Sequence, residues 1–110
     1  MSTQTYPTGG EFLLQPTDAA DVFTPEDFDE NQRMIAQTVT DFVERHIFPV
    51  QEELEHEGKT EMGADLLKQA GEMGLLMVDV PEAYGGMGSD KATIMLVSER
   101  MSAAGSFAVT

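Results

Sequence analysis

Two histidines and many carboxylates are the residues of this sequence whose types could bind a metal ion. Glu53 and His56 have the i, i+3 spacing used in carboxylate-bridged di-iron bundles, where it points both ligands into one site. Such a site also needs a second Glu-x-x-His pair and two further inward glutamates. The other histidine, His46, has Val43 three positions before it. We therefore interpret Glu53 and His56 as part of a solvated helix face and predict no metal site.

No nucleophilic catalyst can be assembled from these residues. The sequence has no cysteine, which also excludes disulfide bonds and thiolate metal sites. His46 lies on the apolar side of an expected helix. We favour a packed ring that bonds a backbone carbonyl, or one stabilised by the helix dipole. We predict no catalytic residue.

A glycine-rich turn, residues 86–91 (GMGSDK), precedes an expected helix and could bind phosphate, since helix amino termini bind anions. The turn lacks the Gly-Lys-Ser/Thr of a P-loop, and Lys91 stands where the dinucleotide-binding motif has its third glycine. No strand long enough for a nucleotide-binding fold comes before it. We therefore predict a turn followed by a helix capped at Ser89 or Asp90.

The small, acidic chain invites comparison with acyl carrier proteins around residues 63–65 (GAD). In those proteins a serine follows the aspartate, and its hydroxyl carries the phosphopantetheine arm. Here that residue is Leu66, which has no hydroxyl. Because the ester cannot form, the carrier function is excluded.

Composition limits the partners of the chain. Its 110 residues form one domain or part of one, and 20 acidic against 6 basic residues give a formal net charge of −14. That charge opposes binding to nucleic acid and to anionic membrane surfaces. The first basic residue is Arg33, so no Arg-rich transit peptide is expected, and no apolar run approaches the ~20 residues of a membrane span. We expect no nucleic-acid partner, no membrane span and a cytoplasmic location.

The first part of the chain is rich in Thr, Gly and Pro and lacks helical periodicity. We expect an extended leader over residues 1–23, either flexible or with its apolar residues 12–14 (FLL) lying against a neighbouring surface. Thr24, followed by a proline and two carboxylates, predicts a helix start. A second start follows directly, because Asp29 and Gln32 have the spacing of a capping box.

Hydrophobic periodicity predicts a helix over about residues 30–47. Its apolar positions follow an i, i+4, i+7, i+11 pattern and are Ile35, Val39, Phe42 and His46. Pro49 then breaks or kinks the chain.

Three further helices are expected, and no segment alternates long enough to form a sheet. Their ranges, with the residue that ends each, are about 50–57 (Gly58), 61–73 (Gly74, a left-handed cap) and Ser89 or Asp90 onward (Gly105). Between the last two lies a loop, residues 77–88, whose proline and glycines favour a rigid joint over a ligand contact. The predicted fold class is all-α with about four to five helices.

Two segments of this loop region carry a resemblance to a known family. Residues 71–75 (GEMGL) and 80–88 (VPEAYGGMG) resemble the acyl-CoA dehydrogenase family, whose members characteristically show Gly-Glu-x-Gly-Leu, then Val-Pro-Glu-x-Tyr-Gly-Gly-x-Gly, then a helix rich in glutamate. Further matching segments are residues 32–35 (QRMI), 41–44 (DFVE) and Pro49. Residues 23–28 (FTPEDF) and 105–110 (GSFAVT) look like a long-chain, bacterial-type branch. The resemblance covers about residues 23–110.

The resemblance implies a helical amino-terminal domain, a central β-domain and a carboxy-terminal helical bundle. In the family, FAD lies between the latter two, where a carboxylate removes the α-proton of the acyl-CoA and hydride passes to the flavin. Those residues follow the end of this chain, so we assign it no catalytic residue and no FAD ligand. Residues 24–110 are then part of the amino-terminal domain, and the isolated chain is expected to be inactive.

The complete enzyme implied by the resemblance oxidises a fatty-acyl-CoA to the trans-2-enoyl-CoA, uses an electron-transfer acceptor and forms a homo-oligomer. In the family, the segment after the last helix of this domain lines the deep end of the acyl pocket. We therefore expect Phe107 to line that pocket, with plain packing in the helical core as the alternative. The alternative to an enzyme is a non-enzymatic helical interaction module, or a remnant, derived from the same domain.

Overall fold

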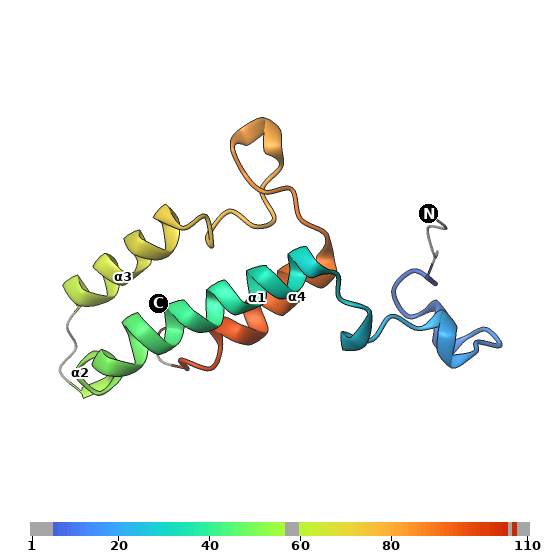
Figure 1. The fold of residues 1–110 in the computed structure, drawn as a ribbon, viewed down its shortest axis with the longest axis horizontal. Helices are drawn as coiled ribbons and strands as arrows, with labels where there is room; N and C mark the ends of the chain where they lie inside the picture. Colours follow the sequence, from blue (N-terminus) through green and yellow to red (C-terminus); the bar gives the residue numbers. More distant parts are fainter. Residues whose placement is uncertain (1–5, 57–59, 106, 108–110) are drawn as a thin grey trace.

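The computed structural model describes residues 6–56, 60–105 and 107. Over these residues the chain is helical and holds no strand, which confirms the all-α prediction (Figure 1). Its α-helices are α1 (Glu30–Phe42), α2 (Gln51–His56), α3 (Thr60–Glu72) and α4 (Lys91–Met101). A π-helical turn spans Val43–Ile47, and 3-10 turns span Glu11–Leu13, Ala19–Asp21, Pro25–Asp27, Phe48–Val50 and Glu82–Tyr84. None of the described helices is long and apolar enough to cross a lipid bilayer.

α1 begins with the predicted capping box. The backbone N–H of Gln32 donates to the carboxylate of Asp29 at 2.8 Å, and the Gln32 side-chain carbonyl accepts from the Asp29 N–H at 2.9 Å. Two amides that a helix start leaves without partners are thereby bonded. The start predicted at Thr24 yields only the 3-10 turn Pro25–Asp27, because Phe28 and Asp29 have extended ψ angles of 131° and 174°.

The helical path continues beyond α1, although its hydrogen-bond spacing changes. Val43–Ile47 form a π-helical turn, in which each bond spans one residue more than in an α-helix. Pro49 follows in a 3-10 turn, and α2 begins at Gln51. Pro49 therefore lies where the α-helical pattern is interrupted, as predicted. The predicted end of α2 near Gly58 lies outside the described residues.

The π turn changes which residues face the core. Ile47 is fully buried, whereas His46 is exposed and stacks its ring on Phe42, with the ring centroids 5.4 Å apart. The prediction that His46 lies on the buried side is therefore wrong. An added residue in the turn rotates the side chains that follow it around the helix axis, so Ile47 takes the inward position.

α3 ends as its sequence predicts. Gly74 has a left-handed φ of 78°, and its N–H donates to the carbonyl of Gly71 at 3.0 Å. The N–H of Leu75 donates to the carbonyl of Ala70, also at 3.0 Å. These two bonds form a Schellman cap, which satisfies carbonyls of the last helical turn. Leu75 is buried, so the chain leaves α3 with an apolar residue in the core.

A compact loop, residues 77–89, joins α3 to α4 (Figure 1). Three backbone hydrogen bonds tie its two ends together. They run from the N–H groups of Met87, Gly88 and Ser89 to the carbonyls of Met77, Val80 and Val78, at 3.0, 2.8 and 2.9 Å. Gly86 lies so close to the carbonyl of Val80 that an added Cβ would overlap it. Cross-bonding and close packing of this kind are what a rigid joint requires.

The core forms where α1 packs between its neighbours. α4 runs alongside α1 (Figure 1) and makes the most extensive contacts with it. Leu66 and Ala70 of α3 belong to the same core. The largest fully buried side chains all come from α1 and the π turn: Phe42, Ile47, Val39 and Val43. α4 starts after Asp90, as predicted, but ends at Met101, before the predicted end at Gly105.

Residues 6–28 form an arm that extends away from the helices (Figure 1). Edge-to-face ring pairs link Tyr6 to Phe23 and Phe23 to Phe28, with centroids 5.4 and 5.5 Å apart. The molecule measures 53 × 30 × 22 Å, and its Cα radius of gyration is 17.0 Å. A compact domain of this length has a radius of gyration of about 13 Å. The arm is therefore ordered locally without folding back onto the helical core.

Candidate functional site

The amino termini of α1 and α4 meet at a chain of hydrogen bonds. The side-chain N–H of Gln32 donates to the hydroxyl of Thr93 at 3.0 Å. That hydroxyl donates to the carboxylate of Asp90 at 2.6 Å, and the Thr93 backbone N–H donates to the same oxygen at 2.8 Å. Gln32 and Thr93 are 7% and 5% exposed. Since Asp29 caps α1 through Gln32 and Asp90 caps α4 through Thr93, one buried bond links two helix caps.

Electrostatics at this junction favour carboxylates. Two helix amino termini side by side bring two partial positive charges together, and Asp29 and Asp90 offset them. The pKa of Asp90 is lowered from its ordinary value of 3.8, chiefly by the hydroxyl of Thr93 and next by the Thr93 backbone N–H. Gln32 lowers this pKa slightly further, while partial burial acts in the opposite direction.

This junction can align helices but cannot carry out a reaction. Its donors and acceptors bond one another, and the Gln32–Thr93 bond is too buried to reach a substrate. Sequence patterns predicted a cap at Asp29 and another at Ser89 or Asp90, of which the structure has Asp90, but not the bond between the two caps. No local signal could have found it, because the partners lie 61 positions apart. We assign the junction a positioning role.

The glycine-rich turn before α4 does not fit a phosphate group. The N–H groups of Gly85, Gly86 and Gly88 donate to the carbonyls of Glu82, Pro81 and Val80, at 2.9, 3.2 and 2.8 Å. A phosphate cradle needs several free N–H groups that point to one place. At the helix start, the carboxylate of Asp90 already accepts from the Thr93 N–H. The turn therefore closes the loop and leads into the capped start of α4.

Neither the candidate metal pair nor the carrier-protein position forms part of a site among the described residues. Glu53 and His56 are both exposed on α2. Within the described ranges, no group of three or more carboxylates and histidines could hold a metal ion. Leu66, which stands where a carrier protein has its serine, is buried in the core.

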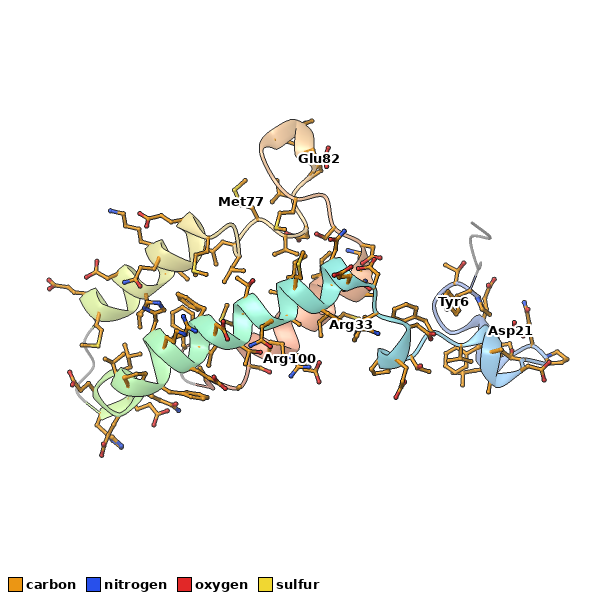
Figure 2. The ribbon with its side chains drawn as sticks, in the orientation of Figure 1. Tyr6, Asp21, Arg33, Met77, Glu82 and Arg100 are labelled. Carbon is orange, nitrogen blue, oxygen red and sulfur yellow. The ribbon has the colours of Figure 1, made fainter. Side chains whose placement is uncertain are left out.

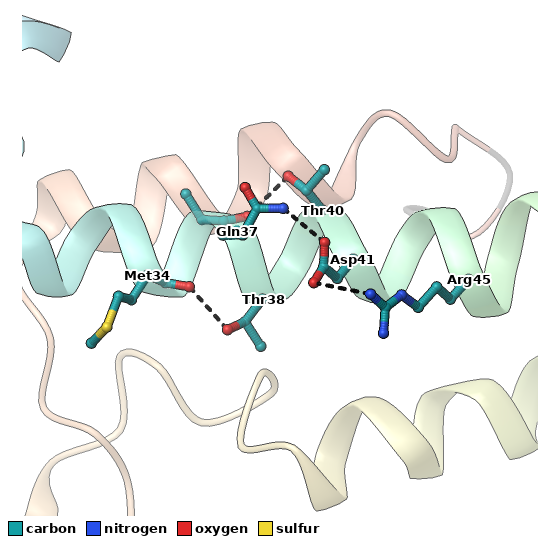
Figure 3. A network of polar contacts seen from close by, with 7 residues as sticks. Met34, Gln37, Thr38, Thr40, Asp41 and Arg45 are labelled. Carbon is teal, nitrogen blue, oxygen red and sulfur yellow. Dashed lines mark hydrogen bonds and ion pairs between the residues drawn. The ribbon is translucent and has the colours of Figure 1, made fainter.

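The exposed face of α1 carries a row of i, i+4 contacts (Figure 3). The side chain of Gln37 donates to Asp41 at 2.7 Å, and the guanidinium of Arg45 lies 3.7 Å from the same carboxylate group. The hydroxyl of Thr38 donates to the carbonyl of Met34 at 2.9 Å. Solvent screens such pairs, so they support the helix weakly and form no substrate site.

Phe107 lies in the helical core beyond the end of α4. Its side chain is 5% exposed, and its ring centroid lies 6.3 Å from that of Phe42. Ala104, three positions earlier, is fully buried in the same cluster. These contacts give Phe107 a packing role, and its role in an acyl pocket stays a prediction.

An apolar groove lies where the arm reaches α4. It is lined by Phe23, Thr24, Pro25 and Phe28 from the arm and by Ala92, Met95, Leu96 and Glu99 from α4. The guanidinium of Arg33 donates to the carbonyl of Glu26 at 3.2 Å and holds the base of the arm on α1. In Figure 2, Tyr6 and Asp21 lie out on the arm, away from Arg33. The sequence did not predict the groove, because it depends on how the arm leaves α1.

The sequence and the fold were compared with those of known proteins. Residues 29–110 match the family described as "Acyl-CoA dehydrogenase, N-terminal domain". A crystal structure of an acyl-CoA dehydrogenase complexed with FAD from Bacillus anthracis has 47% sequence identity and a TM-score of 0.85. This similarity covers 93% of the present chain and 18% of that one.

Curated relatives are also acyl-CoA dehydrogenases, and the chain again matches a small part of each. A probable acyl-CoA dehydrogenase of Bacillus subtilis is 43% identical over 102 residues, which are 93% of this chain and 17% of the relative. The human mitochondrial short-chain specific acyl-CoA dehydrogenase is 32% identical over 81 residues, 74% of this chain and 19% of the relative. The present chain thus spans less than a fifth of the length of these relatives.

Proposed function

This chain belongs to the acyl-CoA dehydrogenase family, and from that premise we propose that it forms the amino-terminal helical domain of an FAD-dependent enzyme. In this proposal the complete enzyme oxidises a fatty-acyl-CoA to the trans-2-enoyl-CoA. One observation carries it: 93% of the chain is similar, at 47% identity, to part of an acyl-CoA dehydrogenase whose structure contains FAD.

The described residues do not themselves fit FAD. The amides of residues 86–89 are bonded within the loop, and a net charge of −14 repels a pyrophosphate. We propose that the flavin and the catalytic carboxylate are held by parts of the complete protein outside this chain. The domain then contributes support, with the Gln32–Thr93 bond fixing α1 against α4.

Phe107 remains our proposed lining residue of the acyl pocket. The proposal is supported by the family role of the segment after α4 and by the small neighbours of Phe107, such as Ala104 and Gly105. A preference for long acyl chains belongs to the same proposal. So do a homo-oligomeric state, an electron-transfer acceptor and a cytoplasmic location.

The complete protein provides the test. Its gene is read in frame beyond the codon of Thr110, and the protein is purified, scanned for flavin absorbance and assayed with acyl-CoAs and an artificial electron acceptor. A flavoprotein that forms enoyl-CoA is expected. A stop codon at that point, or a complete protein without flavin and without activity, would support the helical interaction module or remnant instead.

A further inference from the structure

The arm, residues 6–28, displays an apolar knob formed by Phe12, Leu13 and Leu14. The side chains of Leu13 and Leu14 are 74% and 88% exposed, and that of Phe12 is 39% exposed. Three consecutive large apolar residues at the surface are unusual unless another surface covers them. We therefore ask which surface could cover the knob, since the described residues leave it exposed.

Hydrogen bonds fix the backbone of this knob. The N–H of Thr8 donates to the carboxylate of Glu11 at 2.9 Å, and the N–H of Leu14 donates to the Glu11 carbonyl at 2.9 Å. The hydroxyl of Thr17 donates to the carbonyl of Gln15 at 2.9 Å. Because the turn is already formed, docking loses less conformational entropy than the ordering of a loose chain.

The matches to the relatives differ in length. The matches to the two Bacillus proteins cover 93% of this chain, about 102 residues, so they include most of the arm. The match to the human short-chain enzyme covers 81 residues, about 20 fewer and close to the length of the family span 29–110.

The relatives with the longer matches are themselves longer proteins. The 102 matched residues are 17% of the Bacillus subtilis protein, a length of about 600 residues. The 81 matched residues are 19% of the human protein, a length of about 430 residues. The arm explains fewer than 30 residues of this difference. The longer relative therefore holds roughly 100 residues or more that the shorter relative lacks, which we call the extra segment.

We propose that the knob of Phe12, Leu13 and Leu14 docks onto this extra segment within the same polypeptide. The inference rests on the proposed function, since it requires this chain to continue into an enzyme of the longer kind. If the arm served only the parts common to all these enzymes, the match to the shorter relative would be expected to include it as well. The longer match in the longer relatives thus favours the extra segment as the occupant.

Charge argues against a second copy of the arm and describes the surface that receives it. Residues 6–28 contain five carboxylates and no Lys or Arg: Glu11, Asp18, Asp21, Glu26 and Asp27. Two such arms repel one another, and the whole chain carries a net charge of −14. The knob therefore needs an apolar pocket whose rim carries Lys or Arg.

Photo-crosslinking in the complete protein tests the inference. A benzophenone amino acid replaces Leu14, and in a matched control it replaces Gln15, which is exposed and polar. After irradiation, crosslinked peptides are mapped by mass spectrometry onto residues with or without a counterpart in the short-chain relative. We expect crosslinks from position 14 to the extra segment, at least tenfold above those from position 15. Adding Leu13→Asp should abolish them while the flavin content stays unchanged.

The outcomes separate this inference from the proposed function. Crosslinks to parts shared with the shorter relatives, crosslinks to a second copy, or a yield no higher than the control would each overturn the docking inference. Flavin content and acyl-CoA oxidation are measured on the same sample, so docking can fail while the enzyme is active. A purified native protein with an intact mass of only 12.0 kDa would overturn both proposals.

Discussion

The side-chain amide of Gln32 donates a 3.0 Å hydrogen bond to the hydroxyl of Thr93, which lies 61 positions further along the chain. Both residues also take part in the caps of their own helices. The relative placement of α1 and α4 is therefore coupled to the start of each helix. Loss of this bond should therefore destabilise the starts of both helices.

Gln32→Ala should destabilise the fold by about 1–3 kcal/mol, because it removes a buried hydrogen bond and half of the α1 capping box. Urea unfolding followed by circular dichroism measures the change. The control is Gln37→Ala, on the exposed face of α1, which should change stability by less than about 0.5 kcal/mol. Equal effects of the two substitutions would contradict the role of the junction.

Acid should weaken the junction through Asp90. Its pKa is lowered in the folded chain, so its contribution to stability is present above the unfolded value of 3.8 and is lost as the pH falls through the lower folded value. Thr93→Val removes the main cause of the lowered pKa and should flatten the loss of stability below about pH 4. Urea midpoints measured between pH 3 and pH 7 test this.

The matched control for this experiment is Thr38→Val. Thr38 is exposed, and its hydroxyl donates only to the backbone carbonyl of Met34. The control should keep the pH dependence of the unsubstituted chain. A Thr93→Val chain with the same slope would show that the hydroxyl of Thr93 does not stabilise the charged form of Asp90.

Gly86→Ala should destabilise the loop by about 1–3 kcal/mol, because the new Cβ would overlap the carbonyl of Val80 and force the backbone to shift. Gly105→Ala is the control, since open space surrounds that position, and it should be neutral or stabilising by up to about 1 kcal/mol. Thermal melting of both variants measures the two changes in stability. A neutral Gly86→Ala would mean that the loop is not a rigid joint.

Local signals in the sequence predicted several helix boundaries, although not the end of α4 or the turn that follows Thr24. The capping box of Asp29 and Gln32, the left-handed cap at Gly74 and the start of α4 after Asp90 all lie where their residue types indicated. Each of these features depends on contacts within about five residues, which the sequence displays directly. That is why the all-α class and the main helices could be predicted.

Features that depend on distant contacts could not be predicted in this way. A strict helical period assigned His46 to the core, but the π turn gives that place to Ile47. The hydrogen-bond geometry of a π turn is poorer than that of an α-helix, so such a turn forms where packing of the helix compensates for it. No single residue type in the sequence indicates where this happens. The bond from Gln32 to Thr93 could not be predicted from sequence spacing either, because its partners lie 61 positions apart.

The isolated 110-residue chain should retain no FAD. The amides of residues 86–89 in its glycine-rich turn are bonded to backbone carbonyls, and its charge of −14 repels a pyrophosphate. The chain is mixed with excess FAD and desalted, and its visible spectrum is recorded. The complete protein, treated identically, should keep a flavin band. A stoichiometric band on the isolated chain would contradict this prediction.

Phe107→Ala in the complete enzyme should distinguish an acyl-pocket wall from a packing residue. If Phe107 lines the pocket, the ratio of kcat/KM between long and short acyl-CoAs should shift, since one or two methylenes of discrimination are worth about 1–3 kcal/mol. If it only packs, kcat/KM should fall equally for all lengths while Tm decreases. Phe42→Ala is the matched control, because Phe42 is 1% exposed and its ring lies 6.3 Å from that of Phe107. We expect the control to lower Tm without changing the chain-length profile, and Phe107→Ala to change that profile. Identical profiles in the two variants would contradict pocket lining and leave Phe107 a core residue of the helical domain.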